Sequence, residues 1–323
     1  MLLSYNRLFN IAIGSRGCGK SFSGKRWCIN DFIKNGEQFI YMRRTEEELK
    51  KVKDNFFADI IVANVFPDAK FKIEGNTYWI NDKLAGFALA LSTATKYKSN
   101  SFPGVNKVLF DEFLIDKSNH GGYLRGEVER VLNLYETIDR GRDVTRVLML
   151  SNAMSVVNPY FQRWNVQIIP NAKFIKTGTE IIVELVYNQD YLEWKRNTRF
   201  GKMIENTEVG KQIIDNEFVS DNYNFVEKLS GHRIYKFTVK YRSVDIGVWY
   251  NTTNKLFYCS HATQKSVYSF AFTNADHSIN TIMFKRAKAN LFMKQLIEAY
   301  EYGLVRYETI QAKATMLEIF YYI

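Results

Sequence analysis

The first pattern able to do chemistry is a glycine-rich stretch near the N-terminus, which matches the phosphate-binding pattern G-x-x-x-x-G-K-[ST]. Glycines let successive backbone N–H groups curve around phosphates, and the start of a helix adds its positive end. We expect Lys20 to reach the β- and γ-phosphates of a nucleotide and Ser21 to bind Mg²⁺. The whole loop comprises Gly14, Ser15, Arg16, Gly17, Cys18, Gly19, Lys20 and Ser21.

An acidic pair follows an apolar run further along the chain. Asp111 and Glu112 come directly after Val108–Phe110, so a buried strand would place both at its carboxyl end, where sheet ligands bind. There Asp111 can hold Mg²⁺, through water or directly, and Glu112 suits a general base for an attacking water. An acidic pair alone is common, but with the upstream loop it predicts a nucleotide hydrolase.

A third predicted strand ends in small polar residues. Ser151 and Asn152 follow Leu148–Leu150 and could contact the γ-phosphate or the attacking water. The alternative is an ordinary turn with a helix cap. Beside the first two motifs, the functional interpretation is favoured.

Cationic residues near the predicted site have less certain roles. Arg43 and Arg44 end the second strand and could contact phosphate or DNA, or pair with Glu46–Glu48, and the sequence favours neither. A solvated helix face is the better interpretation of three nearby lysines, Lys50, Lys51 and Lys53. Three further arginines could stabilise a helix C-terminus or offset transition-state charge in a neighbouring subunit. They are Arg140, Arg142 and Arg146, and Lys98 is a second candidate for the inter-subunit role.

The elements that must position these residues alternate along the first half of the chain. Apolar runs predict strands over 8–13, 39–42, 108–110 and 147–150, while helical spacing covers 20–34, 46–65 and 127–138. Residues 71–91 are typical of a β-meander, with a turn at Asn81–Lys83. Strands alternating with helices predict an α/β fold with a mostly parallel sheet.

The pattern changes after about Tyr187. Residues 188–226 are polar and predict a linker with some helix, whereas the strand-like runs from Arg233 and a helix over 285–300 predict an α+β unit. We therefore expect a P-loop ATPase domain over residues 1–187, a linker over 188–227 and a smaller α+β domain over 228–323.

Composition excludes several classes of protein. The chain of 323 residues is 46% hydrophobic and 24% charged, which is ordinary for a globular protein and excludes disorder. Three cysteines give neither a disulfide framework nor a zinc pattern. No secretion signal is evident, and the longest uncharged run, 147–162, is too short to span a bilayer. We expect a soluble intracellular protein with no membrane partner.

The charge is uneven along the chain. Lys and Arg number 44 against 34 Asp and Glu, a net charge of +10, and residues 228–323 alone hold 13 basic and 6 acidic residues. An excess of positive charge favours a polyanionic partner. The C-terminal domain is therefore the expected docking surface for nucleic acid.

With these motifs, the sequence resembles the φ29-like bacteriophage DNA-packaging ATPases. The resemblance covers essentially the whole chain and rests on the strings GSRGCGKS, GEQFIYMRR, KSNSFPGVNKVLFDEF, LNLYETIDR, LSNAMSVVNPYF, RNTRFGKMIENTEVG and IGVWYN. It implies an additional-strand (ASCE) ATPase domain and a C-terminal domain resembling a vestigial RNase H-like nuclease. It also implies a homo-oligomeric ring, a pentamer, that translocates double-stranded DNA at the portal of a phage prohead in the host cytoplasm. A structural RNA is a possible further partner.

The resemblance also implies roles for individual residues. Lys20 and Ser21 correspond to the phosphate loop, Asp111 to the Mg²⁺-associated acid and Glu112 to the catalytic glutamate. Arg140 corresponds to a trans-acting arginine finger. Lys98 corresponds to a lysine in inter-subunit catalytic contact.

Three alternative functions remain open. A large terminase would also cut DNA, but a nuclease needs several carboxylates for two metals, and Asp245 and Asp276 lack a convincing third partner. We therefore expect no nuclease activity. A nucleic-acid-binding module that uses ATP only as a switch is the second alternative. A small-molecule kinase is the least favoured, because no acceptor-binding lid is apparent.

Overall fold

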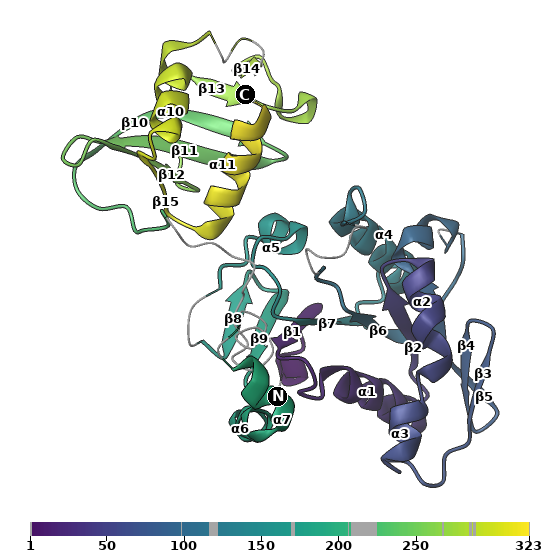
Figure 1. Ribbon diagram of the computed structural model, residues 1–323. Helices are drawn as coiled ribbons and strands as arrows, with labels where there is room; N and C mark the ends of the chain where they lie inside the picture. Colours follow the sequence, from purple (N-terminus) through teal and green to yellow (C-terminus); the bar gives the residue numbers. More distant parts are fainter. Residues whose placement is uncertain are drawn as a thin grey trace. The chain divides into compact units, whose positions relative to one another are not determined.

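Two units make up the chain, residues 1–220 and residues 221–323, and Figure 1 colours them along the sequence. The structure is a computed structural model. It describes residues 2–97, 99–115, 122–168, 172–205, 207, 225–266, 268–283, 286 and 289–322. We refer to the two parts as unit 1 and unit 2.

Unit 1 is built on a sheet whose described strands number nine, in the order β3-β4-β5-β2-β6-β7-β1-β9-β8. The strands from β5 to β9 in this order pair in parallel, and antiparallel strands extend both edges. The predicted α/β fold with a mostly parallel sheet is therefore confirmed. The strands are β1 (Phe9–Gly14), β2 (Gln38–Arg43), β3 (Phe71–Glu74), β4 (Thr77–Ile80), β5 (Lys83–Ala90), β6 (Val105–Asp111), β7 (Arg146–Asn152), β8 (Phe174–Thr177) and β9 (Ile181–Val186).

Helices cover both faces of this sheet. Figure 1 shows α1 (Lys20–Asn35) on one face and α4 (Glu127–Asp139) with α5 (Pro159–Trp164) on the other. On the α1 face, Cys28 and Leu109 belong to one buried apolar cluster. The other helical segments of unit 1 are η1 (Leu2–Tyr5), α2 (Glu46–Val52), η2 (Lys53–Asn55), α3 (Ala58–Val62), η3 (Leu91–Tyr97), α6 (Gln189–Asn197) and α7 (Arg199–Ile204).

The predicted helix over 46–65 is wrong as one continuous element, because it is broken between α2 and α3. Phe56 and Phe57 lie at the break and are both buried, with 0% and 3% of their surface exposed. Consecutive residues of a helix point about 100° apart, so a single straight helix would not bury both rings on one stripe. The break lets Phe56 stack on Phe39, with ring centroids 5.3 Å apart.

Unit 2 is a smaller α+β unit with a mixed sheet in the order β14-β13-β10-β11-β12-β15. The antiparallel meander β10-β11-β12 lies at its centre, and the outer strands pair in parallel with their neighbours. Two helices pack on one sheet face around the buried Phe237, Ile246 and Leu296. The elements are β10 (Arg233–Tyr241), β11 (Val244–Asn251), β12 (Leu256–Ser260), β13 (Ser269–Ala271), η4 (Asn274–Asp276), β14 (Ile282–Met283), α10 (Leu291–Glu301), β15 (Val305–Tyr307) and α11 (Ile310–Tyr322).

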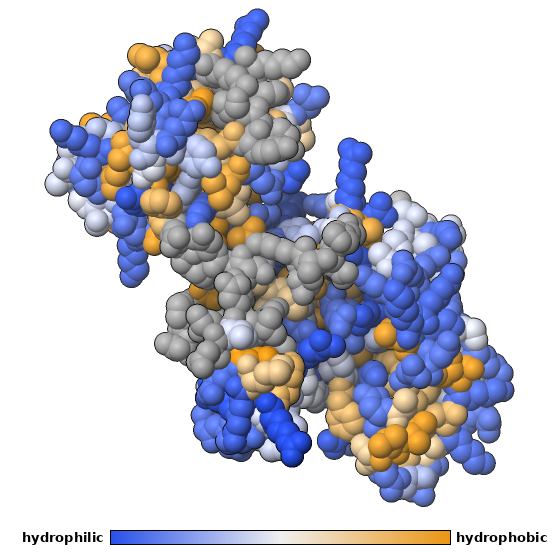
Figure 2. Space-filling view, in the orientation of Figure 1, coloured by the Kyte–Doolittle hydropathy of each residue, from blue (hydrophilic) through white to orange (hydrophobic). Residues whose placement is uncertain are grey.

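The described part of the chain contains no helix long and apolar enough to cross a membrane. Figure 2 shows an apolar patch over α3, where Ile61 and Val62 are exposed. On the neighbouring helical segments, Lys51 pairs with Glu47 at 2.8 Å, and Lys53 pairs with Asp54 at 3.3 Å. Lys51, whose side chain is 69% exposed, fits the interpretation of a solvated helix face. That interpretation does not hold for Lys53, which lies in η2, is only 17% exposed and also donates to the carbonyl oxygen of Gly75 at 2.6 Å.

Candidate nucleotide-binding site

The phosphate-binding loop joins β1 to α1 at the carboxyl edge of the sheet. Gly17 and Gly19 have φ angles of +88° and +85°, which glycine adopts without the strain that a side chain would add. At Gly14 a Cβ atom would lie 2.8 Å from the carbonyl oxygen of Val186 in β9. The glycines therefore let the loop turn tightly and pack directly on the neighbouring strand.

Lys20 lies folded back over this loop. Its Nζ donates to the carbonyl oxygens of Gly14 and Ser15 at 2.9 and 2.8 Å, and to Oδ1 of Asn152 at 3.2 Å. Burial lowers the pKa of Lys20. The structure thus brings Asn152 into contact with the loop, and Ser151, which is buried, pairs in register with Ile13 of β1.

Asp111 ends β6 beside the start of α1. Its Oδ1 accepts a hydrogen bond from Ser21 Oγ at 3.0 Å, and its Oδ2 lies 3.4 Å from both Tyr41 Oη and an Arg43 nitrogen. Burial raises the pKa of the Asp111 carboxyl, and the positive charge of Arg43 acts in the opposite direction. The loop and the acidic strand, 90 residues apart at these two residues, therefore meet at one point.

The donor set at this point fits a Mg²⁺ ion. A serine hydroxyl and a carboxylate are hard oxygen ligands, and their hydrogen bond shows that both oxygens face the same position. Within the described ranges, no three His, Cys, Asp or Glu side chains gather as a metal site. That fits Mg²⁺, which is commonly held by one or two protein groups together with phosphates and water.

Glu112 follows Asp111 in a left-handed backbone conformation, with φ of +55°. This conformation turns the chain away from the strand, and the Glu112 side chain is 60% exposed. Its Oε2 accepts a hydrogen bond from Arg43, whose side chain is only 8% exposed and which also faces Asp111. Arg43 therefore pairs with the acidic motif rather than with Glu46–Glu48.

Comparisons with known proteins agree with this geometry. The model of the family Podovirus DNA encapsidation protein (Gp16) matches residues 1–322. The chain belongs to this family. Relatives within it include the DNA packaging proteins of Bacillus phages PZA and phi29. Each is 38% identical over 322 residues, covering 99% of this chain and 95% of the relative.

Solved structures of the podovirus family share the fold. The bacteriophage Phi-29 viral genome packaging motor assembly contains a chain that is 37% identical, with a TM-score of 0.78, covering 99% of this chain and 97% of that one. The crystal structure of the N-terminal domain of the DNA packaging ATPase from bacteriophage phi29 is 44% identical, with a TM-score of 0.54. The match covers 58% of this chain and 95% of the phi29 domain.

A buried ion pair behind the acidic motif has no signal in the sequence. Arg44 Nε donates to both carboxylate oxygens of Glu127 at 3.1 and 3.0 Å, and the two side chains are 4% and 0% exposed. Tyr160 of α5 donates to Glu127 at 2.7 Å, and Arg44 also donates to the carbonyl oxygen of Phe113. The end of β2, the chain after Glu112, α4 and α5 are thereby tied together.

Arg140 lies apart from the nucleotide edge of its own sheet. α4 begins near this edge of the sheet, at Glu127, which pairs with Arg44. The helix has 13 residues and is therefore ~20 Å long, so Arg140, which follows its C-terminus, lies ~20 Å from that edge. The Arg140 guanidinium donates to the carbonyl oxygen of Asn100 at 2.8 Å. Lys98 lies outside the described residues.

The other two arginines of this group serve the fold. Arg142 donates to several backbone carbonyls, among them Val105 at 2.7 Å and Ile138 at 3.0 Å. Arg146 donates to Asn6 at 2.8 Å. These hydrogen bonds stabilise the fold of unit 1, so both arginines have a structural role.

The substitution Asp111→Asn is expected to raise the melting temperature of the nucleotide-free protein at pH 7 by a few degrees. Because the pKa of Asp111 is raised in the folded state, the carboxyl favours folding at low pH, and that contribution is lost as the pH rises through the raised pKa. The amide carries no charge, so the gain should vanish at pH 3.5. Thermal unfolding at both pH values measures it. A lower melting temperature at pH 7 would show instead that pairing with Arg43 outweighs the cost of burial.

Proposed function

We propose that this chain is the ATPase subunit of a phage genome-packaging motor, which hydrolyses ATP to move double-stranded DNA into a preformed procapsid. The observation that carries the proposal is the meeting of the phosphate-binding loop with the acidic strand, at the 3.0 Å contact between Ser21 and Asp111. Relatives named DNA packaging proteins match along 99% of the chain and support the same activity. The motor would act in the host cytoplasm, at the portal vertex of the procapsid.

The nucleotide would bind along the loop Gly14–Ser21, with its phosphates at the start of α1. Lys20 would leave the carbonyl oxygens it contacts and turn to the β- and γ-phosphates. Ser21 and Asp111 would hold Mg²⁺, which when bound neutralises charge on the phosphates. Ser151 and Asn152, at the end of β7 next to the loop, would contact the γ-phosphate or the attacking water.

Glu112 would be the general base that takes a proton from the attacking water. In the structure its Oε2 accepts a hydrogen bond from Arg43, so the carboxylate is already engaged by a side chain of β2. We therefore propose that Glu112 must separate from Arg43 before hydrolysis. The strained left-handed backbone at Glu112 is consistent with a residue that changes conformation.

Arg140 and Lys98 would complete the site of a neighbouring subunit in a ring, which we take to be a pentamer. The support is the direction of α4, because Arg140 follows the end farthest from its own loop. An arginine from a neighbour would offset the charge that develops on the phosphates during hydrolysis.

Unit 2 would dock nucleic acid, either DNA or a structural RNA, or the portal. A groove of about 570 Å³ on this unit contains Lys236 and Lys255 beside Tyr250 and the exposed Tyr302. The Lys236 ammonium lies 5.4 Å from the centre of the Tyr250 ring. Cations beside aromatic rings can contact both the backbone and the bases of a nucleic acid.

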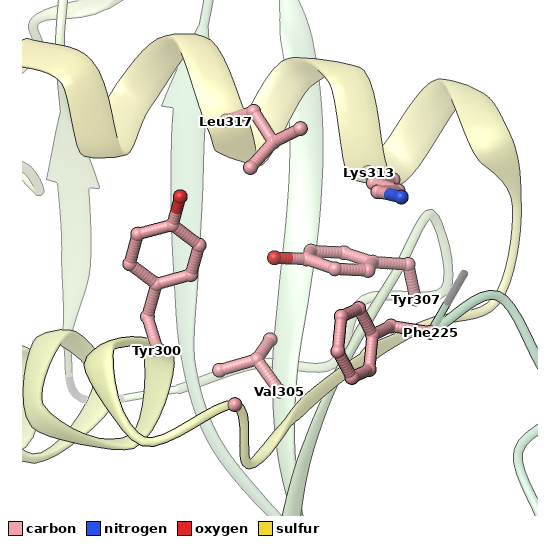
Figure 3. Close-up of a pocket in the computed structure, with 7 residues that line it drawn as sticks. Phe225, Tyr300, Val305, Tyr307, Lys313 and Leu317 are labelled. Atoms are coloured by element: carbon pink, nitrogen blue, oxygen red, sulfur yellow. The ribbon is translucent and has the colours of Figure 1, made fainter. Parts of the chain in front are cut away.

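A second cavity in unit 2, of about 180 Å³, has a related composition (Figure 3). Tyr300 of α10 and Tyr307 of β15 point their hydroxyl groups into the space beneath α11, and Lys313 of α11 also lines the cavity. Burial lowers the pKa of Lys313. Aromatic rings and a cation thus recur on this unit.

We further propose that unit 2 has an RNase H-like sheet without nuclease activity. The ATPase domain would comprise residues 1–187, the linker 188–227 and the C-terminal domain 228–323. Its candidate acids are engaged in contacts that stabilise the fold. Asp245 pairs with Lys240 at 2.6 Å, and Asp276 accepts the backbone N–H groups of Arg242 and Ser243. A nuclease would need such carboxylates to hold two metal ions.

Two substitutions should separate nucleotide binding from hydrolysis. Lys20→Ala should abolish ATP binding, because it removes the ammonium group that meets the phosphates. Glu112→Gln should still bind ATP but lose about 100-fold or more in kcat, because the amide cannot accept the proton. Calorimetry and phosphate release measure the two steps. Glu47→Gln, on an exposed side chain, is the matched control. Undiminished turnover by Glu112→Gln would assign the base to another residue.

Mixed rings should reveal whether Arg140 acts in trans. We expect Arg140→Ala subunits and Glu112→Gln subunits to be inactive alone, because each lacks one group of every site. In a mixture, an intact Glu112 of one subunit can face an intact Arg140 of the next, so ATP hydrolysis should partly recover. Activity measured across mixing ratios provides the test. Absence of recovery at every ratio would contradict a finger supplied by the neighbour.

Reversing charge in the groove of unit 2 should weaken binding to nucleic acid. The double substitution of Lys236→Glu and Lys255→Glu should lower affinity for DNA or RNA and reduce the slope of log affinity against log salt by about 2, since roughly one unit is lost per phosphate contact. Titrations of the full chain with duplex DNA and with structured RNA at several salt concentrations measure this. The control is Lys265→Glu on an exposed loop. An unchanged slope with both nucleic acids would place the docking surface elsewhere.

A further inference from the structure

The helix that follows the sheet of unit 1 lies against the phosphate-binding loop. From α6, Tyr191 Oη donates to the carbonyl oxygen of Arg16 at 3.2 Å, and Lys195 Nζ donates to the same oxygen at 2.8 Å. The Lys195 ammonium also lies 5.4 Å from the centre of the Tyr191 ring. One carbonyl of the loop therefore accepts two side-chain hydrogen bonds from a single helix.

The contact is close because the next residue of the loop is a glycine. A Cβ atom at Gly17 would lie 2.2 Å from Tyr191 Oη, much closer than non-bonded atoms approach. Gly17 also has a φ angle of +88°. A glycine at this position thus serves the turn of the loop and the approach of α6 together.

The two donors determine how one peptide group of the loop is turned. In a trans peptide the carbonyl and the following N–H point in opposite directions. With the Arg16 carbonyl held toward α6, the N–H of Gly17 points away from that helix. Consecutive N–H groups of such a loop form the concavity that binds phosphate. Holding this carbonyl therefore prepares one donor of the concavity in advance.

The charge of Lys195 also favours an anion in the loop. Burial lowers the pKa of Lys195, and the positive charges of Arg16 and Lys20 lower it further. Three cationic side chains thus surround one loop, and their mutual repulsion falls when a polyphosphate binds.

A rigid corner connects this helix to the next one. Thr198 Oγ1 donates to the carbonyl oxygen of Lys195 at 2.7 Å and accepts the N–H of Gly201 at 3.0 Å. A Cβ atom at Gly201 would lie 2.0 Å from the Lys195 carbonyl oxygen, so only glycine lets α7 approach. The residues of this corner belong to the RNTRFG part of the string noted in the sequence, over 196–201.

We infer that α6, supported by α7, forms a clamp on the phosphate-binding loop, in which Tyr191 and Lys195 are positioning residues for nucleotide binding. The inference rests on the proposed ATPase function and adds residues to its site. Through the corner at Thr198, a change in the loop on nucleotide binding moves α7, in the part of the chain that leads toward unit 2.

The test uses the full chain with Mg·ADP and Mg·ATP. Tyr191→Phe removes one hydroxyl group, and Lys195→Met removes one charged donor of similar length. We expect Lys195→Met to raise the Kd for Mg·ADP about tenfold, the loss typical of one charged hydrogen bond, while kcat changes much less. Tyr191→Phe should raise Kd less, and Lys195→Arg should restore most of the affinity, because arginine can still donate to the carbonyl.

Matched controls separate the clamp from a general loss of charge or stability. Lys202→Met, on the exposed face of α7, and Tyr187→Phe, on an exposed ring, should leave Kd unchanged. Hydrogen exchange at 199–204 should slow on addition of Mg·ADP in the unmodified chain. In the Tyr191→Phe and Lys195→Met double variant, this protection should be lost even at saturating nucleotide.

The results distinguish failure of the clamp from failure of the proposed ATPase function. If the unmodified chain binds and hydrolyses ATP while Tyr191→Phe and Lys195→Met match it in Kd and in exchange, the clamp is overturned and the ATPase function stands. Equal weakening by Lys195→Met and Lys202→Met would also overturn the clamp, because net charge would explain both. If the unmodified chain neither binds nor hydrolyses ATP, the ATPase function fails and the clamp fails with it.

Discussion

Asp111 places a carboxylate in the interior of unit 1, at the end of β6, where water solvates it poorly. Side chains from two other elements face it: Ser21 from the start of α1, and Tyr41 and Arg43 from β2. Burial nevertheless dominates and keeps the pKa of Asp111 raised. A buried charge that its neighbours compensate only in part is well suited to bind a cation. The loop, β2 and β6 must meet at one edge of the sheet for this arrangement to exist.

Arg43, the last residue of β2, and Arg44, the residue after it, divide their contacts between the nucleotide-binding site and the helices behind it. Successive side chains of a strand point to opposite faces. Arg43 meets Asp111 and Glu112, whereas Arg44 meets Glu127 at the start of α4. Removing either partner of a pair as deeply buried as Arg44 and Glu127 would leave an uncompensated charge. This pair therefore fixes the start of the helix that leads to Arg140.

Cationic side chains form a distinct arrangement in each unit. In unit 1, Lys195 joins Arg16 and Lys20 around the phosphate-binding loop. In unit 2, cations lie over aromatic rings, as Arg233 does over Trp249 at 5.1 Å. The first arrangement suits a small polyphosphate and the second an extended polyanion.

The sequence alone determined the parts whose geometry depends on near neighbours. The loop Gly14–Ser21, the α/β alternation of unit 1 and the strand that carries Asp111 all follow from local spacing and apolar runs. Predictions failed where burial of distant residues decided the backbone, as at Phe56 and Phe57, which interrupt the predicted helix over 46–65. α11 was missed because its sequence is apolar on most sides and shows little helical periodicity.

Only the tertiary structure decided the partners of the charged side chains. Arg43 and Arg44 could have met phosphate or the adjacent Glu46–Glu48. Arg44 does lie 4.0 Å from Glu48, but the shorter contacts of the two guanidinium groups are to residues 69 and 83 positions away. The contact of Lys195 with the loop spans 179 residues. Such pairs depend on the order in which strands assemble into the sheet. Local sequence predicted the central strands but not β8 and β9, and the burial of the whole sheet specifies which strand ends become neighbours.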